Sequence, residues 1–323
     1  MIFFRKLGLW TIGAVYVLIL VGGVVRATGS GMGCPDWPKC FGTWIPPTDI
    51  SQLPANYKEI FGEKLKGEVV FNALKTWIEY FNRLVGVLIG FLIFGTFIAS
   101  FFAFWKKDNT IVWLSFAAFV LVGIEGWLGS KVVSGELHPV MITFHMLFSI
   151  VIVFILLYAV ARSYNSVIII ENVQESSSLS FLVILAILLT LGQVLLGTQV
   201  REMIDKVSAT MGDTLRNQWV AKAGGKFQLH GLFSIVVLGI NLLLFYRIRK
   251  NISEKGTIYK FTLWLLILVL VEILSGIFLA YLDFPAIMQP IHLTLATVAL
   301  GIQFVIYLFL NKESVFRSMA SPQ

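Results

Sequence analysis

Eight long apolar segments constrain the fold of this chain more than any other feature. An α-helix of about 20 residues rises about 30 Å, which is the thickness of the hydrocarbon core of a bilayer. Only 13% of the 323 residues are Asp, Glu, Lys or Arg, about half the fraction that soluble domains carry. We therefore predict an all-α membrane protein with transmembrane helices at about 8–25, 78–104, 111–133, 139–161, 179–200, 226–246, 261–282 and 287–310.

The short loops between these segments predict the orientation in the membrane. The connections at 134–138 and 283–286 contain no Lys or Arg, whereas the other short loops share a side with Arg5 and Lys6 and are basic. By the positive-inside rule both termini are then cytoplasmic, in what we expect to be a bacterial cell membrane. This topology accounts for the net charge of +7 without nucleic-acid binding. The basic residues of those loops are Lys106, Lys107, Arg247, Arg249, Lys250, Lys255, Lys260, Lys312 and Arg317.

Both cysteines of the chain lie in the first of two long loops, 26–77 and 201–225, that this topology places outside. Cys34 and Cys40 are separated by five residues, two of which are prolines. On the oxidising side of a membrane a lone close pair favours a disulfide bond. A redox-active dithiol and two free thiols are the alternatives.

The two halves of the chain repeat polar residues in the same order. At an offset of 147 residues, the equivalent positions are Glu125, Gly129 and His145 with Glu272, Gly276 and His292. At an offset of 148 residues Asn82 is equivalent to His230. At an offset of 175 residues, the equivalent positions are Gly22 and Arg26 with Gly197 and Arg201.

This repeat predicts the domain organisation. Each half holds four predicted helices, and an even number gives both halves the same orientation. The chain should therefore form two parallel-repeat four-helix bundles, related by a pseudo-two-fold axis along the membrane normal. We expect the N-terminal bundle at 1–162, which includes the outer loop, a cytoplasmic linker at 163–178, and the C-terminal bundle at 179–323.

Histidines inside the apolar segments are the first candidates for a binding site. An ionisable group costs at least ~2.5 kcal/mol near the bilayer centre, so it needs a partner or a function. Besides His138, the chain has His145, His230 and His292. The last two belong to one predicted bundle, and two neutral imidazoles facing each other suit a six-coordinate haem iron. Zinc would need three or four ligands, and hydrogen bonding between helices is the alternative role.

Two groups of polar residues mark the outer ends of the predicted helices. Arg26 and Arg201 suit the propionates of a haem near that face, and snorkelling to the membrane interface is the alternative. Glu79, Asn82 and Arg83 share one helix face, because residues three and four apart are neighbours. Either Glu79 and Arg83 form an ion pair, or the Glu79 carboxylate is directed at the ligand that the first bundle binds.

Several segments together resemble the haem A synthase family over nearly the whole chain. They are VVRATGSGMGCPDWPKCFGTWIPP, WIEYFNRLVG, HPVMITFHMLFS, LLGTQVRE and IHLTLATVALG. The resemblance implies an enzyme that oxidises a ring methyl of haem O to a formyl group, by two successive hydroxylations and loss of water from the gem-diol. The eight predicted helices and the parallel repeat agree with the architecture of that family.

The resemblance also implies haem-binding roles for individual residues. In the C-terminal bundle, His230 and His292 match the two axial ligands of a haem b, the cofactor, and we place Arg201 beside it. In the N-terminal bundle, which would bind the substrate haem, His145 matches one iron ligand, and we assign Arg26, Asn82 and Arg83 to the same site. Glu125 and Glu272, deeper in the membrane, are expected to have structural or proton-path roles.

The start of the second predicted helix matches the family with one departure. Glu79 matches the catalytic glutamate and is expected to accept a proton or to stabilise positive charge on the methyl carbon. Cys34 and Cys40 match the outer-loop cysteine pair. The usual motif of the family is Glu-x-x-His-Arg, whereas this chain has Asn82 before Arg83. Because an amide is a poor ligand for haem iron compared with imidazole, bis-histidine ligation of the substrate haem is not expected.

The expected function is therefore that of a haem A synthase, with electrons leaving through haem b to an acceptor that the sequence does not identify. Haem O is the expected substrate, haem O synthase is an expected partner, and the oligomeric state is left open. One alternative is a dihaem b-type protein that only transfers electrons, which would require a second histidine pair. The other is a haem-binding assembly or transport protein, which would not need Glu79.

Overall fold

A computed structural model describes residues 1–62, 70–135, 137–165, 167, 168, 170, 173, 176–252 and 256–316. Eight of the described helices are long and apolar enough to cross a membrane, one for each predicted segment. They are α1 Ile2–Ala27, α3 Ala73–Phe104, α4 Asn109–Ser134, α5 Pro139–Ser163, α6 Ser176–Met211, α8 Gly224–Asn251, α9 Thr257–Tyr281 and α10 Met288–Leu310. The chain is thus an all-helical integral membrane protein.

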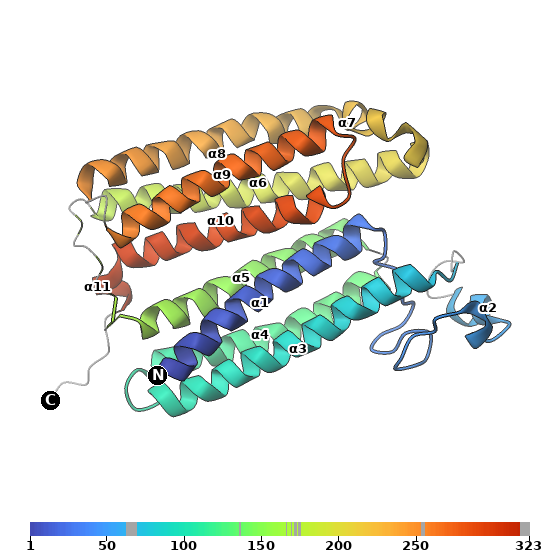
Figure 1. The fold of residues 1–323 in the computed structure, drawn as a ribbon, viewed down its shortest axis with the longest axis horizontal. Helices are drawn as coiled ribbons and strands as arrows, with labels where there is room; N and C mark the ends of the chain where they lie inside the picture. Colours follow the sequence, from blue (N-terminus) through green and yellow to red (C-terminus); the bar gives the residue numbers. More distant parts are fainter. Residues whose placement is uncertain are drawn as a thin grey trace.

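The long helices form two groups that lie side by side (Figure 1). The N-terminal helices, α1, α3, α4 and α5, pack on one another around buried side chains such as Ile89, Ile93 and Leu156. The C-terminal helices, α6, α8, α9 and α10, pack around a second core that includes Leu244 and Leu265. The N-terminus and the C-terminal end of α10 lie at the end of the molecule opposite the two long loops (Figure 1).

Helix α10 joins the two groups, because it packs on α1 and α5 as well as on α6 and α9. In its most apolar stretch 56% of the residues are buried, compared with 17–33% in the other seven long helices. Glycines allow the close approach. A Cβ at Gly23 would lie 2.7 Å from Cβ of Pro290, and a Cβ at Gly301 would overlap the hydroxyl of Tyr16.

The structure differs from the prediction at the second long loop, 201–225. Helix α6 continues to Met211, whereas the apolar pattern predicted a loop from 201 onward, and the short helices η3 Asp213–Gln218 and α7 Trp219–Lys222 follow it. The added turns are polar, but pairs of opposite charge four residues apart stabilise a helix in water. Arg201 pairs with Asp205 at 2.7 Å and Glu202 with Lys206 at 2.6 Å.

The first long loop contains η1 Ile50–Gln52 and α2 Tyr57–Gly62, and it lies beyond the N-terminal end of α3 (Figure 1). Its small core includes Phe41, Tyr57 and Phe61 around the cysteines. Cys34 and Cys40 are bonded to each other and fully buried. The predicted disulfide is therefore confirmed, and neither a dithiol nor a pair of free thiols is present.

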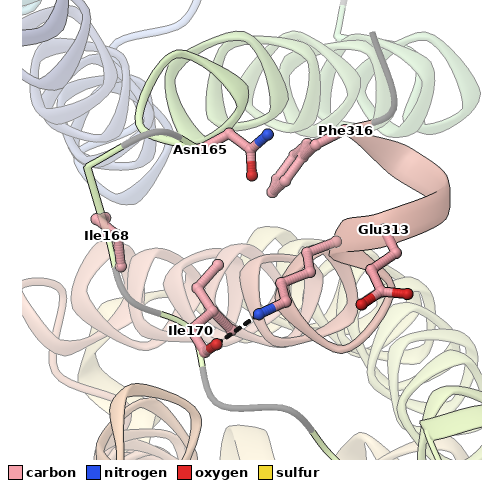
Figure 2. Close-up of a pocket in the computed structure, with 6 residues that line it drawn as sticks. Asn165, Ile168, Ile170, Glu313 and Phe316 are labelled. Atoms are coloured by element: carbon pink, nitrogen blue, oxygen red, sulfur yellow. Dashed lines mark hydrogen bonds between the residues drawn. The ribbon is translucent and has the colours of Figure 1, made fainter.

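At the opposite end, the connection between the two halves meets α11 Lys312–Val315. Figure 2 shows the pocket of about 320 Å³ between them, where Lys312 donates a hydrogen bond of 2.5 Å to the backbone oxygen of Ile170. Six residues of the predicted linker, 166, 169, 171, 172, 174 and 175, lie outside the described ranges, as do Lys255 and Arg317 from the orientation analysis. No histidine lines this pocket.

Candidate functional site

His230 on α8 and His292 on α10 face each other inside the group of C-terminal helices. Their ring centres are 6.2 Å apart, and the ring planes are inclined by 75°. Half of this 6.2 Å spacing, 3.1 Å, accommodates a metal–nitrogen bond of about 2 Å plus the radius of a five-membered ring. The pair therefore has a spacing and a donor chemistry that fit the two axial positions of a haem iron.

A hydroxyl and a carboxylate from α9 orient the ring of His292. Ser275 Oγ donates to the backbone oxygen of Glu272 at 2.7 Å and lies 2.7 Å from Nδ1 of His292. Because a hydroxyl has one hydrogen, Ser275 accepts from Nδ1–H of the imidazole. Glu272 Oε1 lies 3.1 Å from the same nitrogen. Nε2 is left as the electron-pair donor, which is the usual organisation around a metal-ligating histidine.

Each of these histidines packs against a glycine of a neighbouring helix. A Cβ at Gly197 on α6 would lie 3.3 Å from Cε1 of His230, and a Cβ at Gly276 on α9 would lie 3.3 Å from Cε1 of His292. Such a separation is tighter than most real Cβ contacts, so a larger residue would displace the ring. The glycines thus let both imidazoles sit directly against the adjacent backbone.

The N-terminal helices repeat this arrangement at the equivalent positions. A Cβ at Gly129 on α4 would lie 3.5 Å from Cε1 of His145, and a Cβ at Gly22 on α1 would lie 3.8 Å from Oδ1 of Asn82. Asn82 therefore takes the place in the N-terminal group that His230 takes in the C-terminal group. Four side chains, three of them imidazoles, lie against four glycines in the same pattern.

Glu125 stands beside His145 as Glu272 stands beside His292. Glu125 Oε1 lies 3.2 Å from Nδ1 of His145, and it accepts a short hydrogen bond from the hydroxyl of Ser149. In this group the hydroxyl comes from α5, the helix of the histidine, rather than from the helix of the glutamate. Both groups of helices thus place a carboxylate near Nδ1 of a histidine. The accompanying hydroxyl comes from the helix of the histidine in one group and from the helix of the glutamate in the other.

Glu79 and Arg83 connect α3 to the disulfide loop. Glu79 is only 3% exposed, and its carboxylate accepts hydrogen bonds from Arg83 at 2.5 Å and from the backbone N–H of Cys34 at 2.9 Å. Arg83 also donates to the backbone oxygens of Asp36 at 2.8 Å and Lys39 at 3.0 Å. The ion pair considered from the sequence is present, and the guanidinium is directed at the loop.

Arg26 on α1 and Arg201 on α6 share one carboxylate. Asp205 Oδ2 lies 3.2 Å from Arg26, and its Oδ1 lies 2.7 Å from Arg201. Arg201 also donates a short hydrogen bond to Gln289. The two guanidinium groups that the repeat made equivalent therefore meet at the junction of the two groups of helices, where carboxylates of a ligand would find two cations.

Comparison with known proteins identifies the family. Residues 5–304 match the COX15-CtaA family, which is described as cytochrome oxidase assembly protein.

The chain belongs to the COX15-CtaA family.

The resemblance stated from the sequence is thereby confirmed. Among similar proteins, the heme A synthase of Shewanella oneidensis is 25% identical over 245 residues, which cover 73% of this COX15-CtaA chain and 70% of that protein. The heme A synthase of Nitrosomonas eutropha is 36% identical over 124 residues, which cover 35% and 34%. That of Alkalihalophilus pseudofirmus is 33% identical over 123 residues, which cover 37% and 32%.

In the N-terminal group of this COX15-CtaA protein, Asn82 belongs to the glycine-backed pattern and His138 does not. Asn82 has a buried Oδ1 for which the described part of the chain offers no hydrogen-bond partner. His138 is exposed at the N-terminal cap of α5 and is no part of the glycine-backed pattern. The N-terminal site therefore offers one imidazole, from His145, and one free amide oxygen.

Several site residues of this COX15-CtaA protein were not predicted from the sequence, or were predicted without a specific role. Glu125 and Glu272 were expected to be structural or to conduct protons, and the twenty-residue spacing from each to its histidine was the available signal. Ser275 and Gln193, which donates to the backbone oxygen of His230 at 2.9 Å, gave no signal of their own. Asp205, which pairs with both Arg26 and Arg201, was not singled out from the sequence.

Proposed function

We propose that this COX15-CtaA protein is a haem A synthase, which oxidises a ring methyl of haem O to a formyl group. The observation that carries the proposal is the repeated pattern of ligand positions backed by glycine. One copy holds two opposed imidazoles, which suits a permanently bound electron-transfer haem. The other copy holds one imidazole and an amide, which suits a haem that is itself the substrate of a reaction.

The C-terminal site is assigned to haem b. His230 and His292 would hold the iron, Ser275 and Glu272 fix the ring of the second ligand, and Arg201 would neutralise a propionate. When bound, haem b supplies one-electron transfer between the substrate and an external acceptor. The chain's own contribution is to hold both imidazoles in place and to keep Nε2 of His292 available.

The N-terminal site is assigned to haem O. His145 would bind the iron, Asn82 would lie near the other face, and Arg26 would bind a propionate. Glu79 stands at the outer end of the same helix as Asn82. Hydrogen bonds from Arg83 and from the backbone N–H of Cys34 stabilise the negative charge of its carboxylate. An ionised carboxylate would stabilise positive charge on the methyl carbon, and this is the role we favour.

We also infer the membrane arrangement of the two halves. The N-terminal helices with their outer loop, 1–162, and the C-terminal helices, 179–323, would be two four-helix bundles related by a pseudo-two-fold axis along the membrane normal. Both termini would be cytoplasmic, and the disulfide loop would be outside. The N-terminus and the C-terminal end of α10 lie at the same end of the molecule, opposite the long loops, which supports their placement on one side of the membrane (Figure 1). Haem O synthase would supply the substrate.

Extraction of the pigments tests this function directly. The protein, purified from a host that makes haem O, should yield haem A or a hydroxylated haem O together with haem b. His138→Ala should give the same pigments, because that side chain lies outside the site. Recovery of haem b alone would instead support a protein that only transfers electrons or delivers haem.

The departure at Asn82 leads to a prediction about spin state. With one imidazole from His145, the iron of bound haem O should be high-spin. Asn82→His should shift it to low spin, because the new imidazole would occupy the position equivalent to His230. Electronic absorption and electron paramagnetic resonance of protein loaded with haem O measure this shift. A low-spin signal from the parental N-terminal site would mean that another residue supplies the second ligand.

A further inference from the structure

A buried layer of polar side chains crosses the C-terminal helices below the two histidines. Gln303 on α10 donates hydrogen bonds to Oγ1 of Thr190 on α6, at 2.9 Å, and to Oδ1 of Asn241 on α8, at 3.1 Å. The exposed fractions of these three residues are 5% or less. Polar groups in this position are costly within a membrane, so their presence calls for a role.

The spacing along each helix relates this layer to the haem b site. Thr190, Asn241 and Gln303 stand eleven residues from Arg201, His230 and His292, respectively. Eleven residues rise about 16.5 Å and turn through three full turns plus about 20°. Each polar residue therefore lies on nearly the same face of its helix as the residue assigned to haem b, and farther from the outer end.

The N-terminal helices have no polar residue at the equivalent positions. The offsets of 175, 148 and 147 residues place Val15, Ile93 and Leu156 opposite Thr190, Asn241 and Gln303. All three are buried and belong to the apolar core of that group. The two groups of helices thus differ at two levels. The C-terminal group has two opposed imidazoles and the polar layer, whereas the N-terminal group has Asn82 and an apolar layer.

Hydrogen bonds and apolar contacts constrain helices differently. Apolar side chains tolerate small rotations and axial shifts of their helices, whereas a hydrogen bond fixes the distance and direction between two atoms. Between membrane helices such bonds contribute little stability each. A buried polar residue is instead well suited to specifying the register of packed helices. Gln303, bonded to two neighbours at once, constrains three helices.

We propose that Thr190, Asn241 and Gln303 are positioning residues for haem b, which hold α6, α8 and α10 in the register that opposes His230 and His292. The proposal rests on the haem b assignment made above. A haem with two axial imidazoles requires both rings at bonding distance from one iron, so its binding is sensitive to a shift of either helix. A site with a single imidazole lacks this requirement, and the equivalent layer of the N-terminal helices is apolar.

The test transplants the apolar layer into the C-terminal helices. The variant Thr190→Val, Asn241→Ile, Gln303→Leu replaces all the bonded partners together, which leaves no polar atom of the layer without a partner. We expect a folded protein whose haem b moves to excess apomyoglobin about tenfold faster than in the parental protein. Its low-spin resonance should broaden, and a high-spin fraction should appear.

The matched control removes a hydroxyl pair from the N-terminal helices. Thr11 and Thr96 lie 2.8 Å apart and are buried, and Thr11→Val with Thr96→Val should leave haem b transfer and resonance unchanged. A parental transfer rate and resonance in the triple variant would overturn the proposal. Absence of low-spin haem b from the parental protein would contradict the haem b assignment itself, so the two failures are distinguishable.

A smaller change keeps the test valid if the triple variant fails to fold. Thr190→Val removes one hydrogen bond from Gln303, whereas Thr190→Ser retains the hydroxyl that accepts it. We expect faster haem b transfer from Thr190→Val and the parental rate from Thr190→Ser. Equal parental rates for both variants would overturn the proposal, since the hydroxyl would then have no positioning role.

Discussion

His292→Ala and His230→Ala should each lower the content of low-spin haem b by at least about tenfold. Each substitution removes one of two imidazoles whose ring centres are 6.2 Å apart, so the iron would be left with a single protein ligand. The absorption spectrum of the reduced protein and the electron paramagnetic resonance of the oxidised protein measure the loss.

Two controls accompany these histidine variants. His138→Ala changes an exposed histidine at the cap of α5 and should leave the spectrum as it is. Gly276→Ala should give an intermediate result, because its new Cβ would lie 3.3 Å from Cε1 of His292 and would push the ring aside. A normal low-spin spectrum in both His292→Ala and His230→Ala would show that haem b is bound elsewhere.

Glu79→Ala and Glu79→Gln should retain haem b but lower the rate of haem A formation by about 10²–10³-fold, the effect of removing one group that stabilises a charged transition state. The haem b ligands belong to other helices, so their site should not change. Haem A formed per haem b, measured on extracted pigments, reports the loss.

The two Glu79 variants separate chemistry from anchoring of the loop. Glu79 holds the backbone N–H of Cys34, and alanine loses that bond. Glutamine keeps an oxygen that can accept it, although the negative charge is gone. If Glu79→Gln formed haem A at the parental rate, the carboxylate would serve only to hold the loop. Glu59→Gln, at an exposed position on α2, is the control for a lost charge in the same outer region.

The sequence predicted the long helices well because an apolar run of 20 residues has few other folds available. It predicted the end of α6 wrongly, since hydropathy falls at 201 while ion pairs between residues four apart continue the helix to Met211. The repeat was visible because Glu125 and Glu272 each stand twenty residues before a histidine. Periodicity alone does not say which pairs meet in space, so the contacts of both glutamates with the imidazoles required the structure.

Contacts with backbone atoms were the hardest to predict at the candidate site. Arg83 binds backbone oxygens of the disulfide loop, and every residue offers such an oxygen, so no residue type marks the partner. Asp205 was missed for a different reason. Its pairing with Arg201 is local, but its second partner, Arg26, is 179 residues away in the chain. The layer formed by Thr190 and Gln303 likewise joins helices that are distant in sequence.

The central place of α10 has a consequence for the route of electrons. The helix that carries His292 packs directly on α5, the helix that carries His145. Axes of helices in contact are about 8–10 Å apart, so one helix-to-helix contact separates the two ligand-bearing backbones, and no lipid intervenes. On the proposed haem assignments, the contact between α5 and α10 would fix the distance that electrons cross between the two sites. That distance would not change with the thickness or composition of the surrounding membrane.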